Sequence, residues 1–77
     1  MDERRWIAAI LAGDMQSFSC LVAKYEKMAY TIAVPIVENR EDAEEVVQDA
    51  FLKMYQALPD FRFDSKFSSW FYRIVYR

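Results

Sequence analysis

Residues 42–77 read DAEEVVQDAFLKMYQALPDFRFDSKFSSWFYRIVYR, and this stretch decides the fold. Its first half repeats apolar residues at offsets of three and four, which predicts an amphipathic helix. Asn39 can cap the start of this helix, and Pro59 predicts that it stops near Leu58. The expected inner stripe is Ala43, Val46, Val47, Ala50, Phe51, Met54, Tyr55 and Leu58.

The outer side of this helix is acidic but carries one apolar residue. Four carboxylates between positions 41 and 45 lie where the helix dipole favours negative charge. Capping and a solvated face account for them, but not for Leu52, which lies beside Gln48 and Asp49. An acidic and amide-bearing face with an apolar residue suits docking onto a basic helix.

The second half of the stretch changes character. Residues 61–66 alternate aromatic with polar side chains and predict an exposed loop. A further helix then follows, with Ser65 or Ser68 as its cap. Its inner face is expected to hold Phe67, Phe71, Ile74 and Val75, and its outer face Lys66, Ser69, Trp70, Arg73 and Arg77.

An aromatic and basic surface of this kind offers a defined chemistry. Unpaired bases stack on aromatic rings while cations follow the phosphates, which is how single strands are bound. The alternative is that Trp70 and Phe63 fold back onto the core, which a domain of this size allows. The spacing leaves both possibilities open.

The N-terminal half predicts two more helices. Asp2 can cap a short one with Trp6, Ile7, Ile10 and Leu11 on one side, and Gly13 suits its left-handed end. A second begins at Asp14 and keeps helical spacing from Phe18 to Ile32. Pro35 is expected to end or kink it near Val34. The sequence therefore predicts an all-α, compact four-helix domain spanning residues 1–77.

Composition supports one small domain with two charged regions. The chain has 77 residues, of which 55% are hydrophobic and 17% aromatic, so it can build a core. Residues 61–77 hold four basic residues and one acidic residue, a net charge of +3. Residues 1–60 hold six basic and eleven acidic residues, a net charge of −5. Partners of both signs are therefore plausible.

Few residues could support redox, metal or acid–base chemistry. Cys20 is the single cysteine and the chain has no histidine, so no metal site or other cofactor is expected. Cys20 is expected to be a small core residue rather than a reactive thiol. No apolar run approaches the roughly 18 residues of a membrane span, so no membrane insertion is expected. A reducing, cytoplasmic setting fits.

Three segments together resemble region 2 of the extracytoplasmic-function sigma factors of bacterial RNA polymerase. They are DAEEVVQDAF at 42–51, Phe61-Arg62, and FSSWFYRI at 67–74. Gly13-Asp14 fits the same pattern, so the resemblance covers nearly the whole chain. It implies a transcription initiation factor whose third helix docks on the clamp helices of the largest polymerase subunit. The positions that match this contact are Glu45, Gln48, Asp49 and Leu52.

The resemblance also implies that the loop and the fourth helix bind the minus-ten promoter element. There they stabilise the melted non-template strand, with one base flipped into a loop pocket. The positions that match or adjoin this contact are Phe61, Arg62, Asp64, Ser65, Lys66, Ser69, Arg73 and Arg77. An anti-sigma factor is a further implied partner.

The chain departs from the family pattern in two places and at its end. Pro35 and the residues through Glu38 stand where the family has a helix closed by a glycine turn. Arg77 stands where the family has an asparagine that helps to read the flipped base. Family members continue into a linker and a second helical domain, region 4, so the sequence is expected to be the N-terminal part of a longer chain.

Two other classes of function compete with this interpretation. One is a helical protein-interaction adaptor that binds no DNA. The other is an enzyme with Asp60 and Asp64 near Arg62 as a hydrolytic or metal site. The absence of histidine and the single glycine argue against an enzyme. Turn formation and helix capping account for these two carboxylates.

Overall fold

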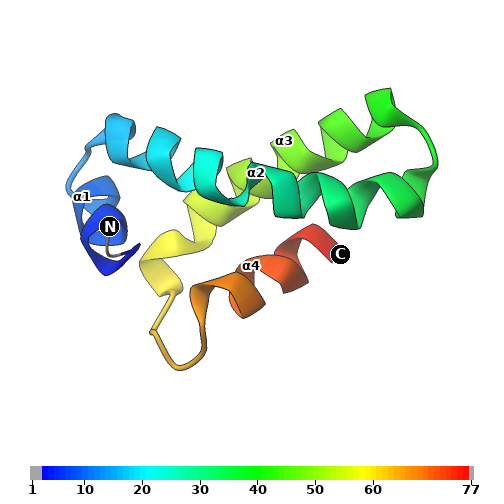
Figure 1. The fold of residues 1–77 in the computed structure, drawn as a ribbon. Coiled ribbons are helices and arrows are strands. Elements are labelled where there is room, and N and C mark those ends of the chain that lie inside the picture. The colour runs from blue at the N-terminus through cyan, green and yellow to red at the C-terminus, as the bar shows by residue number, and fades with distance from the viewer. Residues whose placement is uncertain (1–2, 77) are drawn as a thin grey trace.

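The chain folds into four α-helices and one 3₁₀ turn, and the computed structural model describes residues 3–76. The elements are α1 (Glu3–Leu11), α2 (Met15–Val37), α3 (Arg40–Ala57), the 3₁₀ turn η1 (Leu58–Asp60) and α4 (Phe67–Tyr76). Helices α2 and α3 form a long antiparallel pair, and α4 lies beside both (Figure 1). Helix α1 packs on α2 at the end of the pair that is far from the α2–α3 turn. Within residues 3–76 no strand occurs, so the all-helical prediction is confirmed.

Helix α1 presents a narrower apolar side than the sequence predicts. Ile7 and Ile10 are buried, and Trp6 is half-buried against the core. Leu11 is 52% exposed, so the expectation that it joins them is wrong. It directly follows the buried Ile10, so its side chain lies about 100° further around the helix axis. Gly13 follows with φ +103°, the left-handed conformation that glycine adopts at least cost.

Asp14 caps α2 as the sequence predicts. One carboxylate oxygen accepts a hydrogen bond from the Gln16 amide (3.0 Å) and the other from the Ser17 hydroxyl (2.8 Å). The Ser17 hydrogen bond, followed by the amide bonds, lowers the pKa of this exposed carboxyl below its ordinary value. The predicted cap of α1, Asp2, lies outside the described residues.

Pro35 lies inside α2. The sequence predicts that the helix ends or kinks near Val34, but the helix does not end there. The helix continues to Val37 and closes at Glu38, whose φ is 58° and whose amide donates to the Val34 carbonyl at 2.8 Å. A proline in the last turn removes a single intrahelical hydrogen bond. Ala33, which is fully buried, and the half-buried Val37 hold this turn against the core and keep it helical.

Asn39 caps α3, which confirms the predicted start. Its side-chain oxygen accepts hydrogen bonds from the amides of Glu41 (2.8 Å) and Asp42 (3.3 Å). These two amides have no partner inside the helix, so the side chain replaces the water they would otherwise bind.

We expect Asn39→Ala to lower the free energy of unfolding by about 1 kcal/mol, because the two amides lose their shared acceptor. Urea denaturation followed by circular dichroism measures this change. Asn39→Asp is the matched control, since aspartate also accepts from both amides and should leave stability nearly unchanged. Equal losses in the two variants would contradict a capping role.

The inner stripe of α3 is confirmed except at its edges. Six of its predicted members are buried: Ala43, Val47, Ala50, Phe51, Met54 and Leu58. Val46 is half-buried, whereas Tyr55 is 39% exposed and only meets the edge of the Phe18 ring, at 5.2 Å between centroids. Tyr55 therefore lies at the margin of the stripe and not in the core. Leu52 is 53% exposed, as predicted.

Aromatic rings form the centre of the core. Phe71 of α4 is fully buried, and its ring centroid lies 4.9 Å from Phe51, 5.9 Å from Tyr25 and 6.1 Å from Phe67. This cluster joins α2, α3 and α4. Helix α4 begins at Phe67, so the cap position falls on Lys66 and not on Ser65 or Ser68 as predicted.

The Glu3 carboxylate fastens α1 to α2. It accepts a hydrogen bond from the Tyr25 hydroxyl and forms an ion pair with Lys24 at 2.8 Å. Burial, together with the neighbouring carboxylate, raises the pKa of Tyr25, so the phenol remains a donor at neutral pH. Cys20 is exposed, and its predicted place in the core is wrong. It lies about 100° around the helix from the buried Leu21, on a side that none of the other described helices covers.

Candidate nucleic-acid interface

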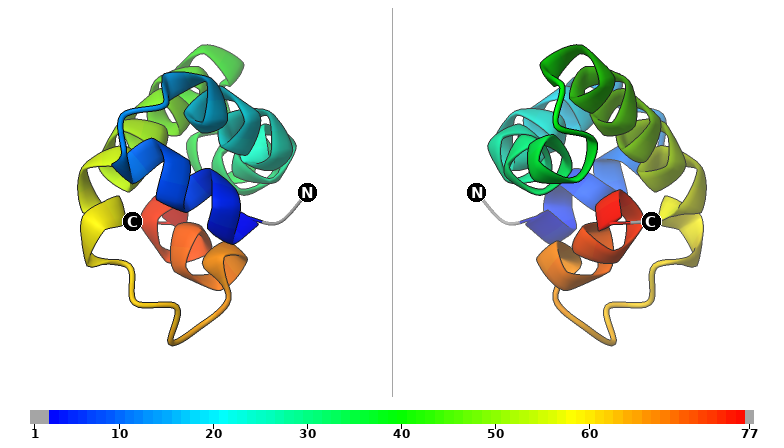
Figure 2. Two further views of the ribbon diagram at one scale, coloured as in Figure 1. Left: turned by 90° about the vertical axis from the view of Figure 1, so that its left-hand side faces the viewer. Right: turned by 90° about the vertical axis from the view of Figure 1, so that its right-hand side faces the viewer.

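The loop at residues 61–66 projects from the helical body between η1 and α4 (Figure 2). The prediction of an exposed loop holds for residues 62–66 but is wrong for Phe61, which is only 9% exposed. The Phe61 ring packs against Trp70 and Phe67, with centroid distances of 4.9 and 5.6 Å. It therefore anchors the loop to α4 and presents little surface to a partner.

Trp70 lies between core and solvent. It is half-buried, because one side of the indole packs on Phe61 and another on Phe67, at 5.6 Å. The alternative in which this residue folds back onto the core thus holds in part, since the indole is neither fully buried nor fully exposed. Its remaining surface adjoins the loop and is still available for stacking.

Phe63 is the aromatic residue of the loop that remains exposed, at 41%. Its ring lies 4.6 Å from Phe61, and the Arg4 guanidinium of α1 lies 4.9 Å from its centroid. Its φ is 61°, in the left-handed region that residues with a side chain rarely adopt. The sequence offered Phe63 as a loop aromatic, but gave no sign of its backbone conformation or of its contact with α1.

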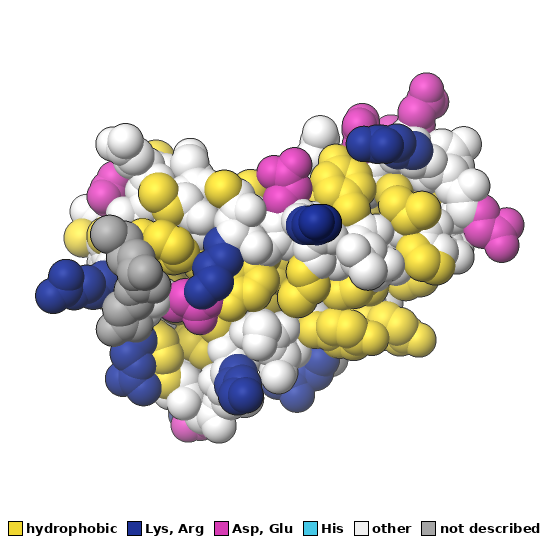
Figure 3. Space-filling view, viewed as in Figure 1, with side chains coloured by type: hydrophobic (Ala, Val, Ile, Leu, Met, Phe, Trp, Pro, Cys, Tyr) yellow, Lys and Arg dark blue, Asp and Glu magenta, His cyan; other side chains and the backbone are white. Residues whose placement is uncertain are grey.

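The predicted cations are exposed and unpaired. Arg62, Lys66 and Arg73 form no ion pair with any residue that the structure describes. Ser69 is exposed beside them on α4, and Arg77 lies outside the described residues. In the view of Figure 3, several basic side chains lie over the lower part of the molecule around the loop, while acidic ones are spread more widely, including the end where α2 meets α3.

A small hollow of about 210 Å³ brings most of the predicted strand-binding residues together. Its walls come from η1, the loop and one face of α4. The residues that line it are Asp60, Phe61, Arg62, Asp64, Ser65, Trp70 and Arg73. Lys66 and Ser69 lie apart from it and line two other hollows. One opening thus brings together aromatic rings, a hydroxyl, carboxylates and guanidinium groups. The rings can stack on the flat face of a base, and the polar groups can hydrogen-bond to its edge.

The predicted polymerase-binding residues form a second surface on α3. Glu45, Gln48, Asp49 and Leu52 are all exposed, and Asp49 makes an exposed ion pair with Lys53 at 2.9 Å. Beside them lies an almost wholly apolar hollow of about 510 Å³ between α2 and α3, which the sequence did not reveal. The residues that line it are Met15, Phe18, Val22, Gln48, Phe51, Leu52 and Tyr55. The exposure of Leu52 is therefore part of a larger apolar surface.

Across residues 3–76, no three histidine, cysteine, aspartate or glutamate side chains lie close enough to hold a metal ion. Asp60 and Asp64 border the same small hollow as Arg62, where they can serve as acceptors for a ligand. Among the described helices, none is both long and apolar enough to span a membrane.

Known proteins resemble this chain in sequence and in fold. The family model for sigma-70 region 2 matches residues 21–77. RNA polymerase sigma-H factor of Pseudomonas aeruginosa is 38% identical over 73 residues, which are 95% of this chain and 38% of that protein. ECF RNA polymerase sigma-E factor of Escherichia coli K12 is 38% identical over 69 residues, which are 90% of this chain and 36% of that protein. The chain thus spans little more than a third of the length of these relatives.

A solved structure shares the whole fold. It is the NMR structure of an engineered region 2 of sigmaE in complex with GTAAAA, which matches with a TM-score of 0.87 at 33% identity. The match covers 97% of this chain and 78% of that one. This chain and that domain therefore share one helical arrangement.

The structure is that of a small all-helical domain with an aromatic and basic surface at the loop and an acidic and apolar surface on α3. The chain belongs to the sigma-70 region 2 family, and its relatives place it among the extracytoplasmic-function type. Proteins of this family are transcription initiation factors and not enzymes. The hydrolytic alternative for Asp60 and Asp64 is therefore set aside.

Proposed function

We propose that this domain acts in transcription initiation by holding a separated DNA strand on the loop and α4 while α3 docks on core RNA polymerase. The observation that carries the first part is the exposed set of Arg62, Lys66 and Arg73 around the rings of Phe61 and Trp70. The complex of the sigmaE relative with GTAAAA supports it, since that domain has the same fold. The strand is the melted non-template strand of the minus-ten promoter element.

The small hollow at the loop is the proposed place for one flipped base. Unstacking a base costs a few kcal/mol, which stacking and hydrogen bonds in the hollow must return. Trp70 supplies a ring, Ser65 and Asp64 supply polar groups for the base edge, and Arg62 and Arg73 meet the adjoining phosphates. Arg77, which stands where the family has an asparagine, would supply a further cation to the same strand.

We expect single-stranded GTAAAA to bind with a strong dependence on salt. If Arg62, Lys66, Arg73 and Arg77 each meet a phosphate, log affinity should fall against log salt with a slope of about −0.7 per contact, or roughly −3. Fluorescence anisotropy of a labelled oligonucleotide between low and moderate salt measures this slope. The steep dependence arises because each contact releases a bound counterion from the strand.

Arg73→Gln is the matched variant for this titration. It keeps a polar side chain at an exposed position of α4, so the fold should persist, while the slope should become shallower by about 0.7. A slope near zero for the unaltered chain would contradict strand binding. It would favour the adaptor alternative, in which both surfaces bind protein.

The proposed polymerase contact lies on Glu45, Gln48, Asp49 and Leu52, and its partner is the pair of clamp helices in the largest subunit. The acidic and amide groups suit a basic helix, and the apolar hollow beside Leu52 offers area for desolvated contact. We also infer that an anti-sigma factor is a partner of the domain and that the domain acts in the cytoplasm. The support for these two statements is the family relationship.

A further inference from the structure

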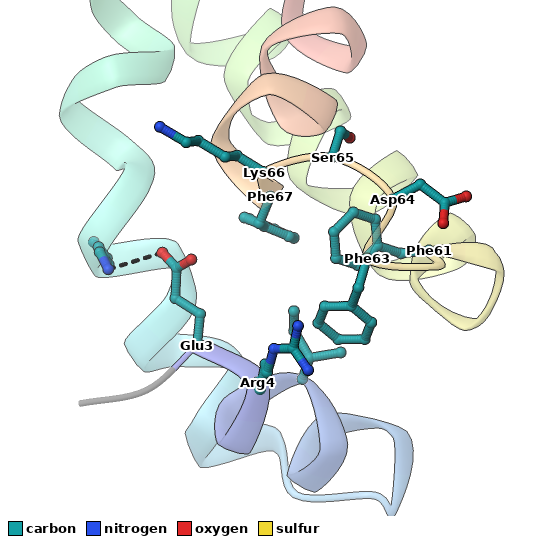
Figure 4. A pocket seen from close by; sticks show the side chains of 10 residues that line it. Glu3, Arg4, Phe61, Phe63, Asp64, Ser65, Lys66 and Phe67 are labelled. Carbon is teal, nitrogen blue, oxygen red and sulfur yellow. Dashed lines mark ion pairs between the residues drawn. The ribbon is translucent and has the colours of Figure 1, made fainter.

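A hollow of about 670 Å³ opens between α1, α2 and the loop. Arg4 lines it from α1, Lys24 from α2, and Phe63 and Lys66 from the loop (Figure 4). It shares Phe61, Asp64 and Ser65 with the small hollow described above, but its other lining residues differ. The two openings therefore share loop residues as parts of their walls.

The backbone at Phe63 is held in an unfavourable conformation. Two non-glycine residues in the described chain have positive φ, Glu38 and Phe63. Glu38 closes a helix, a position where the left-handed conformation is common, but no helix ends at Phe63. Residues held in this way cost free energy and are concentrated at ligand-binding sites. The conformation directs the Phe63 ring toward Arg4 across the hollow (Figure 4).

The opening combines a stacking surface with cations. The Phe63 ring is 41% exposed, and the Arg4 guanidinium lies 4.9 Å from its centroid on an exposed side chain. Guanidinium planes and phenyl rings both stack on bases, so withdrawal of Arg4 by about the thickness of one ring would let a base enter between them. Lys66 is exposed at the same opening, within reach of a phosphate of that nucleotide.

We propose that this hollow is a second nucleotide subsite, in which a base of the bound single strand stacks between Phe63 and Arg4. The proposal rests on the proposed function, because it extends the path of the same strand from α4 onto α1. Stacking surfaces accept all four bases, so the subsite contributes affinity and not base choice. The small hollow, with its polar groups at the base edge, remains the selective one.

An abasic scan of single-stranded GTAAAA tests the proposal. Each nucleotide is replaced in turn by an abasic one, and affinity is measured by anisotropy for the unaltered chain, Phe63→Gly and Phe63→Tyr. We expect two positions at which loss of the base weakens binding by roughly tenfold. Glycine tolerates positive φ, so Phe63→Gly should stay folded, and it should abolish the penalty at one position only. Phe63→Tyr keeps the ring and should preserve both penalties.

The outcomes separate this proposal from the proposed function. No binding of the strand by the folded, unaltered chain would overturn both. The second subsite alone would be overturned if Phe63→Gly still lost affinity at both abasic positions. It would also be overturned if only one abasic position weakened binding and only a Trp70 substitution removed that loss. If Phe63→Gly fails to fold, Phe63→Asn replaces it, because asparagine also tolerates positive φ and has no ring. A preference of more than about tenfold for one base at the Phe63-dependent position would contradict a stacking site, since stacking alone gives only modest preferences.

Discussion

Phe71→Ala should lower the free energy of unfolding by about 3–5 kcal/mol, the cost of removing a fully buried aromatic ring. Phe71 is 0% exposed and contacts Phe51, Tyr25 and Phe67, which come from three different elements. Its loss leaves a cavity at the point where α2, α3 and α4 meet. A domain of this size has a total stability of similar magnitude, so we expect the variant to be largely unfolded at 37 °C.

Tyr72→Ala is the matched control, because Tyr72 is the next residue of α4 and is 47% exposed. Its stability should change by less than about 1 kcal/mol. Urea denaturation followed by circular dichroism compares the two variants. Similar losses for both would show that α4 is not held by the aromatic core.

Trp70→Ala should weaken binding of the single strand by about 1–3 kcal/mol, the usual contribution of a base stacked on an aromatic ring. The same change should also reduce stability, because the indole packs on Phe61 and Phe67. The two effects are separated by measuring affinity at a temperature where denaturation curves show both proteins to be folded.

Trp70→Phe is the control for this measurement. A phenyl ring preserves part of the packing and part of the stacking, so both losses should be smaller than with alanine. A folded Trp70→Ala variant that binds the strand with unchanged affinity would assign Trp70 wholly to the core. The base would then have to stack elsewhere on the loop.

Local rules in the sequence were sufficient to predict the helices. Apolar residues spaced three and four apart gave all four elements, and Asp14 and Asn39 marked two of the starts through the chemistry of their side chains. Gly13 marked the end of α1 because glycine readily adopts the positive φ that is found there. Each of these signals acts within one turn of helix, so it can be read without knowledge of the tertiary structure.

Predictions failed where burial depends on distant segments. Cys20 and Leu11 are exposed because, within residues 3–76, no second helix covers their sides of α2 and α1. Phe61 is buried because Phe67 and Trp70 of the following helix close over it, although the loop alternates like an exposed segment. Pro35 stays helical because the turn around it is packed against the core. In each case tertiary contacts outweighed the local preference.

The candidate site was predictable as a set of charges and rings, but not in its shape. Arg62, Lys66, Ser69 and Arg73 lie exposed where the spacing placed them, whereas their roles toward a partner remain predictions. The hollow beneath α1 joins residues about sixty positions apart, such as Arg4 and Phe63. No spacing rule reaches that far along a chain.

The central claim is that two separate surfaces serve two partners, α3 for polymerase and the loop with α4 for the strand. A titration of the domain against a purified fragment carrying the clamp helices tests it, with Asp49→Arg and Arg73→Glu as paired charge reversals at exposed positions. We predict saturable binding for the unaltered chain and for Arg73→Glu, and none for Asp49→Arg. Unchanged binding by a folded Asp49→Arg variant, or loss of binding by Arg73→Glu, would contradict the account.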